Sequence, residues 1–149
     1  MDDHGALELV LKAFGAAPRP STFVDASHCE ECADHEEILQ RTTPDSMSYA
    51  SFGTPGWDPV SSLKCEGLAY FMPGIAKLAL YRGSHRDYVG QFCTHMHAER
   101  MLCFTAVQRA AMLEFLRYFR ASREADMRSE LGGHELLNRL DRCIHALGS

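Results

Sequence analysis

Apolar residues recur along most of the chain at the three- and four-residue spacing of one face of an α-helix. The pattern is clearest at Leu7, Val10, Leu11 and Phe14, and again at Met112, Phe115, Leu116 and Phe119. No segment alternates apolar and polar residues for long enough to predict a convincing sheet. We therefore expect an all-α fold, a single-domain bundle of about five to seven helices over residues 1–149, with one short strand pair allowed.

Capping signals place the starts of two of these helices. Ser27 followed three residues later by Glu30 has the spacing of a capping box, in which each side chain bonds to the other residue's backbone N–H. Asp25 competes with Ser27 as the cap. Thr105 and Gln108 repeat the same spacing before a later apolar stripe. Both positions are therefore predicted helix starts.

The most apolar stretch, residues 68–80, predicts a buried central helix over about 64–81. Ser61 or Ser62 is expected to cap it, and Pro73 to kink or split it, because proline lacks the N–H that a helix interior needs. At 13 residues the stretch is too short to span a membrane. The other helices are expected over about 7–14, 28–41, 84–94, 106–123 and 136–147.

Residues 42–62 are rich in Pro, Gly, Ser and Thr and predict one long ordered loop. It carries Trp57, the only tryptophan of the chain. Loops of this length are often functional. The favoured interpretation is a loop that Trp57 pins over the core, and the alternative is a lid over a small-molecule site.

The net charge of −5 opposes a polyanion, so we expect no nucleic-acid partner. Ten acidic residues lie within residues 1–50, and half of them fall in eight consecutive positions. These five are Glu30, Glu31, Asp34, Glu36 and Glu37. Such a run is either a solvated helix face or an acidic patch that meets a basic protein partner.

The same segment concentrates thiols and imidazoles. On a helix His28, Cys32 and His35 share one face, and Cys29 lies on an adjacent, overlapping face. Zinc requires four ligands, so one or two have to come from elsewhere in the chain. The candidate metal ligands are His28, Cys29, Cys32 and His35, with Cys93, His95 and His97 as the additional donors.

A redox-active Cys29–Cys32 pair is the alternative, because the dipole at a helix N-terminus favours a thiolate. Glu30, Glu31 and Asp34 lie beside it and are expected to favour the neutral thiol instead. The pattern around the pair also lacks the βαβ unit of thioredoxin-like proteins. Metal binding is therefore preferred over thiol chemistry.

The N-terminus opens with two aspartates where a secretory signal carries positive charge, so no signal peptide is predicted. Six cysteines in such a chain are interpreted as free thiols or metal ligands rather than as a disulfide framework. Cys65, Cys103 and Cys143 are individually typical of small core residues. The expected compartment is reducing, which indicates the cytoplasm.

Three short blocks resemble a group of small uncharacterised bacterial proteins. They are the HCEEC sequence at 28–32, the AYFMPG sequence at 69–74, and Phe104-Thr105 leading into Gln108-Arg109-Ala110. The resemblance covers roughly residues 22–120. It implies a bacterial source and a shared fold, and it implies no activity, substrate or cofactor.

The sequence thus favours a non-catalytic binding protein of the immunity or inhibitor type, which neutralises a basic protein partner through the acidic helix. The alternative is a zinc-binding protein, structural if four protein ligands close the site and hydrolytic if one position stays open. A small-molecule sensor is a third possibility. We assign no catalytic residues, expect no membrane partner, and leave the oligomeric state open.

Overall fold

A computed structural model describes residues 1–81 and 88–149 and confirms the all-helical prediction. The helices, in chain order, are α1 (Asp3–Phe14), α2 (Glu30–Gln40), α3 (Tyr49–Phe52), α4 (Cys65–Leu80), α5 (Tyr88–His95), α6 (Ala106–Ser129) and α7 (Gly133–Gly148). Two 3-10 turns join them, η1 (Pro59–Ser62) and η2 (Ala98–Met101). The described ranges contain no β-strand.

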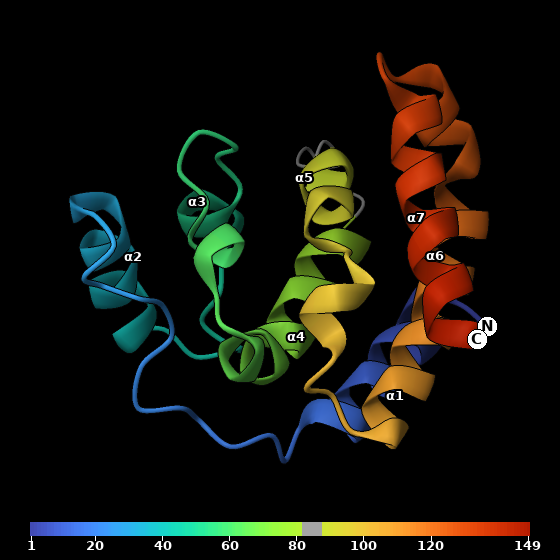
Figure 1. The fold of residues 1–149 in the computed structure, drawn as a ribbon. Helices are drawn as coiled ribbons and strands as arrows, with labels where there is room; N and C mark the ends of the chain where they lie inside the picture. The colour runs from blue at the N-terminus through green and yellow to red at the C-terminus, as the bar shows by residue number, and fades with distance from the viewer. Residues whose placement is uncertain (82–87) are drawn as a thin grey trace.

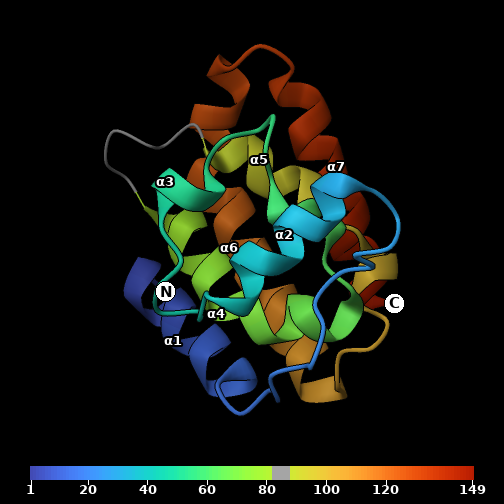
Figure 2. The ribbon, with the colours of Figure 1, turned by 90° about the vertical axis from the view of Figure 1, so that its left-hand side faces the viewer.

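Helix α4 is the innermost element. Its buried residues number eleven of sixteen, and α1, α5 and η2 pack against it. Figure 1 shows α2 and α3 on one side of α4 and the α6–α7 pair on the other. Figure 2 shows the molecule from the side of α2 and α3, and α2 lies nearest the viewer. The hydrophobic core is shared by these helices, and α2 forms an outer layer on it.

Pro73 lies inside α4, which runs unbroken from Cys65 to Leu80. The next residue, Gly74, is required by close packing, because a Cβ there would lie 2.7 Å from the backbone carbonyl oxygen of Pro44. The predicted caps Ser61 and Ser62 are wrong. Both belong to η1, and α4 begins without a side-chain cap.

The predicted capping box at the start of α6 is confirmed, with Thr105 and Gln108 bonding to each other's backbone N–H. The cap predicted for α2 is wrong, because the Ser27 hydroxyl and N–H both donate to Asp25 Oδ1. Cys29 caps α2 instead. The helix start expected at residue 84 lies outside the described residues, and the helix there is seen from Tyr88.

A buried cation joins three helices. Arg123 of α6 is only 2% exposed, and its guanidinium donates to the Leu80 carbonyl at the end of α4 and to the Asp3 carboxylate of α1. A charge buried this deeply is stable only when it is paired and hydrogen-bonded. Arg123 therefore holds the start of α1 and the end of α4 against the second half of α6.

Cys65 and Cys103 form a disulfide, which overturns their interpretation as core thiols. They are 38 residues apart, so nothing in the local spacing indicates the bond. It forms because η2 packs on α4 and brings Cys103, two residues after η2, to Cys65, the first residue of α4. The reducing compartment was inferred from six free thiols and loses that support. Cys143 is buried, as predicted.

In the part of the chain that the structure describes, no helix combines the length and apolar character that a membrane span requires.

Replacing both disulfide partners, with Cys65→Ser and Cys103→Ser, is expected to lower the free energy of unfolding by about 2–4 kcal/mol, since the bond closes a long loop in the unfolded chain. Denaturant unfolding measures this loss, and reduction of the wild type should reproduce it. Six reactive thiols in denatured, unreduced protein would contradict the bond, whereas four are expected.

Candidate metal centre

Polar contacts in its C-terminal half fix the position of α2. The Glu36 carboxylate accepts hydrogen bonds from the backbone N–H groups of Phe23 and Val24, at 2.9 and 3.0 Å. One turn further on, the Arg19 guanidinium donates to the Gln40 carbonyl at 2.7 Å, one of the carbonyls that a helix C-terminus leaves free. The helix is therefore anchored without any metal, and its N-terminus points outward.

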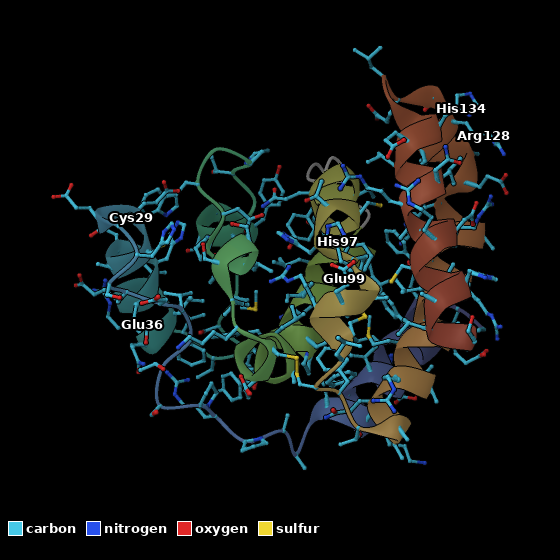
Figure 3. All side chains as sticks on the ribbon, viewed as in Figure 1. Cys29, Glu36, His97, Glu99, Arg128 and His134 are labelled. Carbon is cyan, nitrogen blue, oxygen red and sulfur yellow. A yellow bond between two sulfur atoms is a disulfide. The ribbon has the colours of Figure 1, made fainter. Side chains whose placement is uncertain are left out.

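Three candidate ligand atoms converge at that N-terminus. The sulfur atoms of Cys29 and Cys32 are 3.2 Å apart, and His28 Nδ1 lies 3.5 Å from the Cys32 sulfur. All three atoms lie within 4.8 Å of one another. Figure 3 shows Cys29 at the outer end of α2, with Glu36 further along the same helix. The group is open to solvent, since only Cys32 is partly covered.

Hydrogen bonds from the Cys32 thiol, from the Cys32 backbone N–H and from His28 lower the pKa of the Cys29 thiol. The expectation that the neighbouring carboxylates would dominate is therefore wrong for Cys29. The pKa of Cys32 is raised, first by its hydrogen bond to Cys29, then by desolvation, with Glu31 contributing. The pKa of His28 is raised, first by the hydrogen bond between His28 and Cys29 and then by the charge of Cys29. The group thus favours a negative sulfur beside a positive imidazole.

The spacing suits a tetrahedral metal. Zinc–sulfur bonds of about 2.3 Å and zinc–nitrogen bonds of about 2.0–2.1 Å place neighbouring ligand atoms roughly 3.5–3.8 Å apart. The imidazole–sulfur distance already matches, and the two sulfur atoms need to separate by only about half an ångström. The third pair, His28 Nδ1 and the Cys29 sulfur, lies within 4.8 Å. A zinc-type ion therefore fits these three residues after small side-chain movements, and a fourth ligand has to come from water or another molecule.

His35 does not belong to this group. Its ring is buried, lies edge-on to Trp57 with 4.5 Å between ring centroids, and places Nε2 3.7 Å from the Glu31 carboxylate. Its Nδ1 lies 3.5 Å from the Ser62 hydroxyl of η1. His35 thus packs under the loop of residues 42–62, where Trp57 holds the loop to α2. That loop also contains α3 and η1.

The second predicted cluster does not reach the first. Cys93 is buried with its sulfur 4.0 Å from that of Met127, and burial raises the pKa of this thiol to about 12. His95 is buried against the loop, and His97 is exposed on the segment that follows α5. Figure 3 shows His97 well apart from Cys29. None of the three joins the His28–Cys29–Cys32 group.

Asp58 is the polar residue that the sequence did not single out. Its carboxylate is 8% exposed, caps η1 through the Val60 N–H at 3.0 Å, and accepts from Gln91 Nε2 at 2.8 Å. His95 Nε2 lies 2.7 Å from Asp58 Oδ2, although it makes no hydrogen bond of regular geometry. Asp58, Gln91 and His95 line a cleft of about 700 Å³. Glu31 and Arg139 also border this cleft. The contacts fasten the loop to α5.

The acidic run divides into two sets. Glu36 has a structural role, since its carboxylate accepts hydrogen bonds from the backbone N–H groups of Phe23 and Val24. The carboxylates that remain exposed along α2 are Glu30, Glu31, Asp34 and Glu37. Of these, Glu37 lies 3.5 Å from the Arg41 guanidinium. The acidic surface is therefore smaller than the sequence indicates.

Together these features define a small all-helical protein with a solvent-facing Cys/His group that could hold a metal ion. The chain matches no protein-family model, no curated protein and no solved structure. The resemblance to small bacterial proteins stays a prediction, and function has to be inferred from the chemistry of the site.

Asp58→Asn is expected to lower the free energy of unfolding by about 2–4 kcal/mol. The amide oxygen can still accept the Val60 N–H, but the amide carries no negative charge beside His95 and is a poorer hydrogen-bond partner for Gln91. Thermal or denaturant unfolding measures this. Asp34→Asn, on the exposed face of α2, is the matched control and should change the value by less than about 0.5 kcal/mol. Equal effects of the two changes would contradict the role given to Asp58.

Proposed function

We propose that this protein binds a zinc-type metal ion through His28 Nδ1 and the sulfur atoms of Cys29 and Cys32. The observation that carries the proposal is the convergence of these three atoms within 4.8 Å at one solvent-facing helix end. Thiolate and imidazole ligands favour zinc and similar soft ions over magnesium or calcium. The shared helix turn presets two of the three ligands, so binding orders little additional chain.

The role of such an ion is not to hold the fold together. Glu36 and Arg19 anchor α2 independently of it, and Leu39 of the same helix is buried in the core. Three protein ligands leave one position for a water molecule or for a side chain of another molecule. Glu31, the nearest candidate for a base, faces His35 rather than the thiols. This favours binding over hydrolysis.

Untagged protein purified without chelator is expected to contain close to one zinc ion per chain by elemental mass spectrometry. Cys29→Ser, Cys32→Ser and His28→Asn should each weaken zinc binding by at least about tenfold in competition with a chromophoric chelator, as loss of a ligand does. Circular dichroism should show the same helix content in all three variants, because α2 is anchored elsewhere.

His97→Asn is the matched control for this titration, since His97 is an exposed histidine outside the group. Its zinc affinity should equal that of the wild type. An affinity unchanged by Cys29→Ser and Cys32→Ser would contradict the proposal. So would a loss caused by His97→Asn as large as that of His28→Asn.

A second candidate function is the binding of a basic protein, favoured by the exposed carboxylates of α2. Glu30→Lys with Asp34→Lys should weaken binding of a lysine-rich peptide at low salt, and high salt should weaken the wild type likewise. Glu114→Lys on α6 is the control, since it makes a charge reversal at an exposed site far along the chain. Equal binding by all variants would contradict this role.

A further inference from the structure

We propose that Cys29 and Cys32 are a redox-active dithiol that closes to a disulfide by exchange with a disulfide-containing oxidant, and that the closed form no longer holds a metal ion. The second part rests on the proposed function. The first part stands on the geometry of the two thiols alone.

The two sulfur atoms are already close to bonding distance. They lie 3.2 Å apart, and a disulfide bond of about 2.05 Å requires an approach of roughly 1 Å. Cys29 caps α2 from outside the helix, in an extended conformation. Its carbonyl accepts the Ala33 N–H at 3.1 Å, so closure of the disulfide requires rotation of the Cys29 side chain and not movement of its backbone.

Cys29 is placed as the attacking sulfur. It is exposed, its sulfur lies 3.2 Å from that of Cys32, and it accepts a hydrogen bond from the Cys32 backbone N–H at 3.4 Å. Cys32 lies one helical turn further on and is less exposed, as suits the sulfur that resolves the first product.

The remaining free thiols of the chain are shielded. Cys93 and Cys143 are both buried, and burial raises their pKa values to about 12 and about 11. Cys65 and Cys103 are already joined. An oxidant of moderate size therefore meets two thiols at one place on the folded protein.

The exchange balances with oxidised glutathione as the oxidant. The Cys29 thiolate attacks one glutathione sulfur, forming a mixed disulfide and releasing one glutathione thiolate. The Cys32 thiolate then attacks the Cys29 sulfur and releases the second. The dithiol loses two electrons and two protons, and oxidised glutathione becomes two molecules of reduced glutathione. Both sulfur atoms are then consumed, which leaves His28 as a lone ligand.

The test treats the metal-free, folded protein with excess oxidised glutathione in the absence of air and maps the products by peptide mass spectrometry. A Cys29–Cys32 disulfide is expected, formed at least about tenfold faster than any adduct at Cys93 or Cys143. Cys32→Ser should trap the glutathione adduct on Cys29. Adducts at Cys93 and Cys143 that appear as fast as the disulfide, or a dithiol that survives the treatment, would overturn the proposal.

The same reaction on zinc-loaded protein separates the two proposals. Release of one zinc ion in step with disulfide formation, recorded with a zinc-sensitive dye, supports both. A protein that closes the disulfide but never binds zinc removes the proposed function and leaves the dithiol. A protein that binds zinc at the three ligands but cannot be oxidised after the metal is removed overturns the dithiol alone.

Discussion

A helix that is apolar on nearly every side has to be covered on every side, and α4 imposes this requirement on the molecule. Helix α1, helix α5 and η2 cover it directly, and Arg123 fastens the end of α4 to α1 and α6. Helix α2 is added on the outside and is held at its C-terminal half by the contacts of Glu36 and Gln40 and by the buried Leu39. Its N-terminus is therefore free to face solvent and to carry chemistry.

Local signals in the sequence predicted the fold well. The capping box of Thr105 and Gln108 is correct because both partners lie within one turn, so the bonds follow from spacing alone. The cap of α2 was wrong because Asp25 takes both donors of Ser27, a competition between neighbours that spacing does not rank. The Cys65–Cys103 disulfide was missed because it depends on the packing of η2, which is not a local property.

In the candidate site too, the sequence predicted contacts between residues close along the chain and missed contacts between distant residues. His28, Cys29 and Cys32 were predictable as a group because they lie within five consecutive residues at the start of one helix. His35 has the same helical register, yet the loop that carries Trp57 covers it and makes it a packing residue. His95 was assigned to the metal because its partner was unknown, and the partner is Asp58, a residue 37 positions earlier that looked like part of a turn. Long-range pairing decides such cases, and a single sequence does not show it.

X-ray absorption at the zinc edge of the metal-loaded protein tests the central claim most directly, since it reports the atoms bound to the ion. The structure predicts two sulfur neighbours at about 2.3 Å with nitrogen or oxygen neighbours at about 2.0–2.1 Å, and one sulfur fewer in Cys32→Ser. A spectrum with only nitrogen and oxygen neighbours, or one that Cys32→Ser leaves unchanged, would contradict a metal centre at the start of α2.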